Sequence, residues 1–430
     1  MKTHWKRAGL ASSVIVAALG LVLAVWPDRS EAQPAAPRES ELNEVLSNEL
    51  SAVSELEGMD RKVDAFLQKW DIKGASLAIM RNDSLLYAKG YGWADEAEGI
   101  HMQPSNLLRM ASVSKLITAT DIMILRDKGL LSLDDHIFGE GGLLSDMPYA
   151  ESISDRNYHK ITVEHLLRHQ GGFTVSGGDP MFSTRTVMSN FGLDEAPDNE
   201  TLISCMLKRR LRFQPGQSQA YSNFGYLLLS QVVEKCSGQS YEEFTRDNIF
   251  KPLGIKDFHI ANNYYAQRWP GEVRYYVPSN EPPVPEYNCS GRMVTRCYGG
   301  NDIHALAGAG AWVGSVPELM KFVAAIDGRE GISDVVSAES VKDMVAYFDE
   351  ATFSLGWNDT KPSSGWMRSG SFSGTSALVK YFPDGECWIM ITNASNWKGA
   401  GFSKIISTLF SDLRRSYSSS LPARDFFHGL

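Results

Sequence analysis

Short apolar runs, rich in β-branched and aromatic residues, occur near both ends of this chain. Runs of this length and composition are typical of β-strands. Strands are therefore predicted over residues 74–80, 84–88, 366–367, 376–382 and 386–392. Polar turns at 81–83 and at Asp384-Gly385 separate the members of two pairs, so each of these pairs is expected to form a β-hairpin.

Elsewhere the apolar residues recur every three or four positions, which is the period of an α-helix. Helices are predicted over residues 42–53, 59–70, 112–128, 161–169, 201–212, 225–237, 316–326 and 402–414. Residues 177–200 and 256–300 are polar or rich in proline and asparagine, and we expect irregular surface loops there. A flexible tail is expected over 416–430.

Strands at both ends of the chain with helices between them predict an α+β fold. An antiparallel sheet flanked by helices is expected from about 59–110 and 300–415, and an inserted helical part from about 111–299. Residues 33–58 would form a Pro/Ala linker followed by an N-terminal helix. No internal repeat interrupts this arrangement.

The first 32 residues have the pattern of a secretion signal. Lys2, Lys6 and Arg7 precede an uncharged apolar run from Ala8 to Trp26, and Ser30-Glu31-Ala32 resembles a small-x-small cleavage site. The run is also just long enough to span a bilayer, so an uncleaved membrane anchor is the alternative. In either case we expect the body of the protein to be exported, to the periplasm or the medium.

Charge and cysteine content exclude some classes of protein. The net charge of −9 and the lack of a basic cluster argue against nucleic-acid binding. The five cysteines are odd in number and widely spaced, so they do not form a disulfide scaffold, and none has zinc-ligand spacing. Cys289 and Cys297 lie in one loop, where they could form a bridge or remain free thiols.

Ser112 and Lys115 form the first pattern with chemical meaning. They lie three residues apart at the start of a strongly apolar helix, and therefore on one face of it. Burial lowers the pKa of an ammonium group, and a lysine of lowered pKa beside a serine is one form of activated nucleophile. The same spacing recurs at Ser395 and Lys398, in a polar loop that would leave the lysine hydrated. A helix-capping serine with a surface lysine is the structural alternative for Ser112.

Two further stretches combine polar groups with a rigid neighbour. Tyr221 and Asn223 precede an apolar helix, where a phenol can transfer a proton and a carboxamide can orient a substrate amide. Arg368-Ser369-Gly370 leads into a predicted strand, and glycines there allow a backbone N–H to approach an oxyanion. Taken singly, each stretch is better explained as a turn than as part of a site.

In their order along the chain, the three stretches resemble the motifs of the serine β-lactamase and penicillin-binding-protein superfamily. The similarity is greatest to the group with class C β-lactamases, related esterases and D-amino-acid peptidases. It extends from about residue 60 to 412 and includes the flanking segments 161–169, 221–229, 250–255 and 308–312. The resemblance implies a β-lactamase-like fold with the active site at the interface of the sheet and the helical insertion.

The resemblance also implies a role for each residue of the site. Ser112 would be the acylated nucleophile, and Lys115 and Tyr221 the proton-transfer groups. The backbone N–H groups of Ser112 and Ser371 would form the oxyanion hole. The implied substrate-binding residues are Asn223, Arg368, Ser369 and Gly370.

The first residue of the third motif departs from the family pattern. It is usually lysine or histidine, and here it is Arg368. Arginine does not exchange protons, but its fork can bind a carboxylate and its charge can favour a tyrosinate. This departure places β-lactam hydrolysis in doubt relative to other acyl substrates.

The sequence therefore predicts a serine hydrolase with no cofactor and no metal, acting on a β-lactam, an ester or a D-amino-acid peptide. The partner would be a small molecule or a peptide, including a cell-wall peptide, with membrane contact only through an uncleaved N-terminus. A binding or scaffold protein that keeps the fold without turnover is the alternative.

His165 and His169 have the spacing of two zinc ligands, but the adjacent residues do not complete a metalloprotease motif. The Gly-x-Ser-x-Gly elbow of α/β-hydrolases does not occur.

Overall fold

The computed structural model describes residues 42–173, 178–350 and 352–429. The predicted signal segment 1–32 and the linker residues that follow it lie outside these ranges. None of the helices within the described ranges has both the length and the apolar character needed to cross a membrane.

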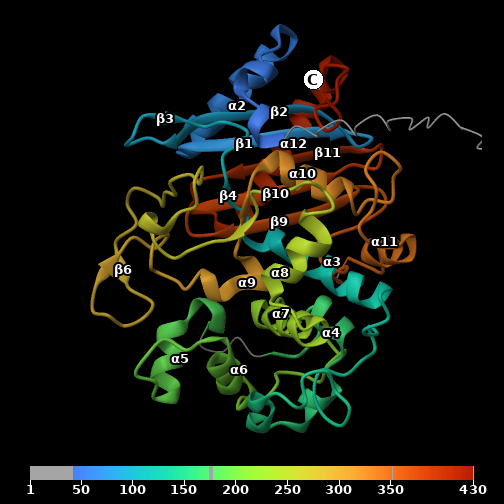
Figure 1. Cartoon of the computed structure of the whole chain (residues 1–430). Coiled ribbons are helices and arrows are strands. Elements are labelled where there is room, and N and C mark those ends of the chain that lie inside the picture. The colour runs from blue at the N-terminus through green and yellow to red at the C-terminus, as the bar shows by residue number, and fades with distance from the viewer. Residues whose placement is uncertain (1–41, 174–177, 351, 430) are drawn as a thin grey trace, which may run out of the picture. The chain divides into compact units, whose positions relative to one another are not determined.

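A six-stranded antiparallel sheet organises the described part of the chain (Figure 1). Its strand order is β3-β2-β1-β11-β10-β9. The strands are β1 (Gly74–Arg81), β2 (Ser84–Asp95), β3 (Ile100–His101), β9 (Trp366–Phe372), β10 (Thr375–Tyr381) and β11 (Glu386–Thr392). The two predicted hairpins are confirmed, and they meet where β1 pairs with β11, with Ala75 opposite Thr392. Strand β9 forms one edge.

The sheet is buried on both faces, as its almost unbroken apolar strands require. Successive side chains of a strand point to opposite faces. In β1, Leu77 and Ile79 belong to the core cluster that includes the apolar faces of α2 (Glu57–Trp70) and α12 (Phe402–Tyr417). Ala78 and Met80 belong to the larger cluster on the other face, with α10 (Val316–Ala324) and the remaining helices.

Most of the remaining helices lie on the β9 side of the sheet (Figure 1). They are α3 (Ser114–Asp127), α4 (Val163–Leu167), α5 (Thr184–Phe191), α6 (Asn199–Leu207), α7 (Asn223–Ser237), α8 (Tyr241–Thr245) and α9 (Ala307–Gly310). Helix α3 is buried from Ser114 to Leu125, so it is a central helix rather than a surface one. It packs against α7, α8 and α9.

Smaller elements complete the described chain. Helices α1 (Leu42–Val45) and α11 (Ala338–Met344) are short. A three-stranded sheet has the order β4 (Leu108–Arg109), β8 (Trp312–Gly314) and β5 (His259–Ile260), and β6 (Val284–Pro285) pairs with β7 (Met293–Val294). Strand β4 leads directly into the Ser112 turn, so this small sheet fixes the entry to α3.

Three predictions of secondary structure are wrong. The loop predicted over 177–200 contains helix α5, whose buried Val187 and Met188 contribute an apolar face that the polar composition obscured. The helix predicted over 42–53 is only α1 followed by 3-10 turns. The tail predicted to be flexible is packed: Phe426 and Phe427 are buried, and the Phe426 N–H donates to Leu85 O on β2 at 3.0 Å.

The structure also bears on the predictions about the cysteines and the domain division. All five cysteines are free, so Cys289 and Cys297 do not form the bridge that the sequence allowed. Cys297 is buried, whereas Cys289 is exposed. The described residues form one compact unit, and the division into an α+β part and a helical insertion stays a prediction within that unit.

Candidate active site

Ser112 lies in a 3-10 turn, Ala111–Val113, that continues into α3. Ala111 has a φ of +48°, a left-handed conformation that costs free energy in a residue with a β-carbon. One turn further along the helix, Lys115 is 0 % exposed. The turn therefore presents a half-buried hydroxyl directly beside a fully buried ammonium group.

Three segments that are far apart in the sequence meet at Ser112 Oγ. The Tyr221 hydroxyl, just before α7, lies 2.8 Å from Ser112 Oγ, and Lys115 Nζ lies 3.3 Å from it. From β9, Arg368 Nη2 donates to the Tyr221 oxygen at 3.2 Å, and its Nε donates to the Ser112 carbonyl at 2.7 Å. The structure thus brings together the three stretches that the sequence singled out.

Burial and hydrogen bonding determine the state of Lys115. Its ammonium group donates to Asn223 Oδ1 at 2.7 Å and to the carbonyl of Ala309. Burial, with a smaller contribution from the Arg368 charge, outweighs the opposing effect of Tyr221 and lowers the pKa of Lys115 to about 8. Lys115 can therefore exchange a proton near neutral pH, as the sequence argument requires.

The pKa of Tyr221 is also lowered relative to the usual value for a phenol. Burial alone would raise the pKa of Tyr221, but the charges on Lys115 and Arg368, together with hydrogen bonding to Lys115 and Ser112, outweigh burial and lower that pKa to about 8. Lys115 and Tyr221 thus form a pair whose members release protons over the same pH range. Such a pair is suited to general-base chemistry on the hydroxyl between them.

Strand β9 supplies the opposite wall of the site. A β-carbon placed on Gly370 would lie 2.3 Å from Met110 O and 3.0 Å from Ser112 N, so only glycine allows this close approach. Along the same edge, the N–H groups of Met367 and Ser369 donate outward, to Asp359 O and Asn358 Oδ1. Because the pattern has a period of two, the Ser371 N–H also points out of the sheet edge.

The predicted substrate-binding side chains are largely engaged within the protein. Arg368 is 1 % exposed, and both of its described hydrogen bonds are to Ser112 and Tyr221. Asn223 is 6 % exposed; it accepts from Lys115 and donates to Asp179 Oδ2 at 2.7 Å. The Ser369 hydroxyl donates to Asn358 at 3.2 Å. The structure therefore places these groups around the nucleophile, with Arg368 facing Tyr221 rather than solvent.

The sequence-based prediction missed Asp179, His169 and Phe353. Asp179 bonds Asn223 and also caps the 3-10 turn at Pro180, a role that the Asp-Pro pair indicates locally. The rings of His169 and Phe353 pack on Tyr221, with centroids 4.4 and 6.0 Å from it. No spacing in the sequence links either ring to Tyr221, so these contacts could be found only from the fold.

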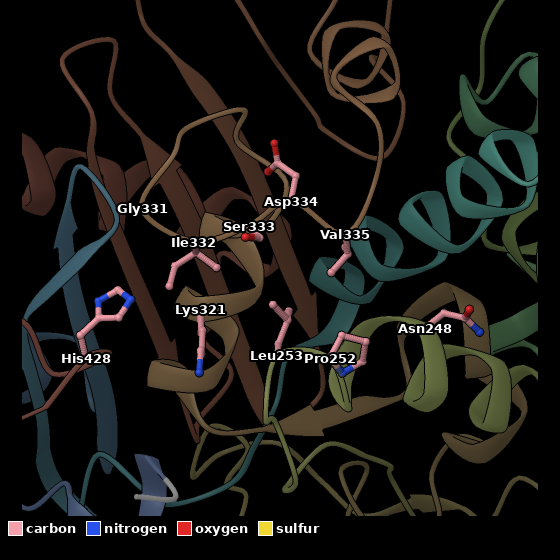
Figure 2. Close-up of a pocket in the computed structure, with 10 residues that line it drawn as sticks. All are labelled: Asn248, Pro252, Leu253, Lys321, Gly331, Ile332, Ser333, Asp334, Val335 and His428. Carbon is pink, nitrogen blue, oxygen red and sulfur yellow. The ribbon is translucent and has the colours of Figure 1, made fainter. Parts of the chain in front are cut away.

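The competing sites do not assemble among the described residues. His165 bonds the Thr162 backbone and His169 packs on Tyr221, and no described group of three or more His, Cys, Asp and Glu residues is placed to hold a metal. A separate cavity has a volume of about 430 Å³, and Figure 2 shows its lining residues, among them Lys321, Asp334 and His428. None of the residues predicted for the active site lines it.

Comparison with known proteins agrees with this geometry. The family described as Beta-lactamase matches residues 59–405, which include all three motifs. This chain belongs to the beta-lactamase family. Family membership and the fold bear out the resemblance found in the sequence and support a serine hydrolase.

This beta-lactamase family member has relatives among the penicillin-binding proteins. It is 29 % identical over 212 residues to a penicillin-binding protein of Bacillus subtilis (strain 168), an alignment that covers 49 % of this chain and 42 % of the relative. It is 25 % identical over 237 residues to Protein flp of Staphylococcus aureus (strain MW2), covering 54 % and 43 %. The matched part thus spans less than half the length of each of these two relatives.

Solved structures share the fold of this beta-lactamase family member. The D-amino acid amidase from Ochrobactrum anthropi SV3, complexed with L-phenylalanine amide, has a TM-score of 0.63 at 20 % identity, covering 86 % of this chain and 99 % of the amidase. The octameric penicillin-binding protein homologue from Pyrococcus abyssi has a TM-score of 0.59 at 20 % identity, covering 85 % and 80 %. These likenesses confirm the α+β, β-lactamase-like fold.

Proposed function

We propose that this chain is an exported serine hydrolase that cleaves amide or ester bonds through an acyl-enzyme on Ser112. The observation that carries the proposal is the convergence of Tyr221 and Lys115 on Ser112 Oγ, at 2.8 and 3.3 Å. A hydroxyl flanked by two groups whose pKa values are lowered to about 8 has a proton acceptor within reach near neutral pH. Export rests on the charge and apolar pattern of residues 1–32.

The proposed reaction transfers one proton in each half. Once the Lys115–Tyr221 pair has lost a proton, the Tyr221 oxygen accepts the Ser112 proton as Oγ bonds to the acyl carbon. The N–H groups of Ser112 and Ser371 stabilise the resulting oxyanion. Tyr221 then gives its proton to the leaving amine or alcohol, and the acyl-enzyme remains. A water molecule attacks this ester, its proton passes to Tyr221, and Tyr221 returns a proton to the released Ser112 oxygen.

The position of Arg368 bears on the substrate. Its guanidinium is buried and bonded to Ser112 and Tyr221, so of the two roles that the sequence left open we favour stabilisation of a tyrosinate over binding of a substrate carboxylate. We therefore place esters and amides without a carboxylate, such as D-amino-acid amides, ahead of β-lactams and D,D-peptides. A structural neighbour named D-amino acid amidase agrees with this order.

Covalent labelling tests the nucleophile. A fluorescent fluorophosphonate should label the native protein and Ser395→Ala, and should not label Ser112→Ala. Label that persists on Ser112→Ala would show that another residue reacts. A native protein that takes no label and turns over none of a substrate panel would favour a binding or scaffold protein with this fold. The panel comprises p-nitrophenyl acetate, a D-amino-acid amide, nitrocefin and a D-Ala-D-Ala peptide.

A further inference from the structure

His169 occupies a strained and fully buried position next to the site. It follows α4, has a φ of +58°, and is 2 % exposed. Its ring lies on the Tyr221 ring, with centroids 4.4 Å apart and an angle of 37° between the planes. A non-glycine residue in this conformation costs free energy, so its surroundings must hold it there.

This one residue holds the backbone on both sides of Tyr221. The Ala220 N–H donates to the His169 carbonyl at 2.9 Å, and the Ser222 N–H donates to His169 Nδ1 at 3.2 Å. Since Nδ1 accepts, the proton of the neutral imidazole is assigned to Nε2. Tyr221 thus lies between two backbone anchors on His169 while the ring of His169 covers one face of the phenol.

These two backbone hydrogen bonds fix the position of a side chain that makes two contacts in the site. The Tyr221 oxygen must lie 2.8 Å from Ser112 Oγ and 3.2 Å from Arg368 Nη2 at the same time. On the carboxyl side, Ser222 also caps α7 through its bond to the Gly225 N–H at 3.1 Å. A shift of the Ser222 peptide would therefore be passed to both Tyr221 and Asn223.

We propose that His169 is the positioning residue for the proposed proton-transfer group Tyr221, acting as a neutral ring that accepts from the Ser222 N–H and supports the phenol. This inference rests on the proposed function. The charged and titratable groups around it are consistent with a neutral ring, because burial and the charges of Lys115 and Arg368 lower the pKa of His169 well below its usual value. Tyr226 and Phe353, whose rings also pack against His169, carry no charge at neutral pH.

Two substitutions separate the hydrogen bond from the ring. His169→Phe keeps an aromatic ring but removes the acceptor, whereas His169→Asn keeps an acceptor at the same place and tolerates a positive φ. His165→Asn is the matched control: it changes a half-buried histidine four residues earlier that has no described contact with Tyr221. The measurements are kcat, KM, the pH profile of kcat/KM, fluorophosphonate labelling and thermal unfolding.

For His169→Phe we expect kcat to fall by about 100-fold with KM changed by less than about twofold, the scale of loss that follows a displaced catalytic group. The acidic limb of kcat/KM should also move to higher pH, since a displaced phenol loses the contacts with Lys115 and Arg368 that lower its pKa. The kcat of His169→Asn should be about tenfold higher than that of His169→Phe, because asparagine restores the hydrogen bond to the Ser222 N–H. His165→Asn should behave as the native protein.

Either of two results would overturn the proposal. One is near-native kcat in folded His169→Phe. The other is equal losses in both His169 variants with an unmoved pH limb, which would reduce His169 to a packing residue. If His169→Phe does not fold, His169→Asn decides alone: a native pH limb and kcat would contradict the role of the ring. Failure of the proposed function itself is distinguishable, because the native protein would then take no label at Ser112.

Discussion

The chain contains two Ser-x-x-Lys pairs, and they differ in almost everything except the spacing. Lys115 is 0 % exposed and donates to Asn223, Ala309 and Ser112. Lys398 is exposed, and its ammonium lies 3.9 Å from the ring centroid of Trp397, which is itself 73 % exposed. Ser112 lies in the turn that leads into a buried helix, whereas Ser395 lies in the loop that follows β11.

The difference shows what the motif requires in order to become a site. Spacing places the amine near the hydroxyl, but burial is what lowers the pKa of the amine. Another segment of the chain must also place a second proton-transfer group at the hydroxyl. Around Ser112 the partners come from the turn before α7 and from edge strand β9. The contacts described around Ser395 and Lys398 are of another kind, because the Ser395 N–H donates to Tyr276 O and the Lys398 N–H donates to Asn396 Oδ1.

The largest expected effect is that of removing Lys115, and removing Lys398 is the matched control. Lys115→Ala should lower kcat/KM on an activated ester by about 10²–10⁴-fold, the usual contribution of a positioned proton-transfer group. Lys398→Ala should leave kcat/KM unchanged. Steady-state kinetics measures kcat/KM of both variants, and circular dichroism checks that each is folded. Similar losses from both substitutions would mean that the two pairs do not differ in function.

An intermediate effect is expected at Arg368 and depends on pH. The working base is a deprotonated group, so kcat/KM should rise with pH and level off above about 8, the pKa of Lys115 and Tyr221. Arg368→Gln removes a positive charge beside the phenol, which raises the pKa of Tyr221 and moves the rise to higher pH. The loss should be about tenfold at pH 7 and smaller at pH 9.5.

Arg368→Lys is the control for charge. It should keep the pH profile near the native one while lowering the plateau, because an ammonium lacks the fixed planar fork with which the guanidinium bonds Ser112 O and Tyr221. A pH profile that Arg368→Gln leaves in place would contradict the assignment of Arg368 to the phenol.

The smallest effect concerns stability at the exposed pair. Lys398→Ala should change the free energy of unfolding by less than about 1 kcal/mol, because an exposed cation–π contact contributes about 0.5–1 kcal/mol. Urea denaturation followed by fluorescence measures it. A larger loss would indicate that Lys398 is packed more tightly than its exposure suggests.

Much of the fold could be predicted from local patterns. The hairpins at 74–95 and 375–392 combine a strong apolar pattern with clear turns, so pattern and turn chemistry agree. Helix α5 and the segment after Ser416 were missed for a common reason. Each is mostly polar, and a few apolar residues such as Val187 and Phe426 hold it to the core through long-range contacts that no local window contains.

The residues of the site also differ in how far the sequence could predict their positions. Lys115 could be placed beside Ser112 from helical spacing alone, and its burial followed from the apolar helix. Tyr221 and Arg368 needed the family resemblance, since nothing local ties them to Ser112. The burial of Arg368 and the contacts of Asp179 and His169 depend on how three segments meet, and only the fold supplies that information.

The close fit of Gly370 against the turn at 110–112 has a consequence for the sheet itself. If β9 slipped by one residue along β10, a serine would take the place of Gly370 and its side chain would meet the Met110 carbonyl. A register shift of β9 is therefore incompatible with the native Ser112 turn, so correct pairing of the outermost strand and formation of the reactive centre depend on each other.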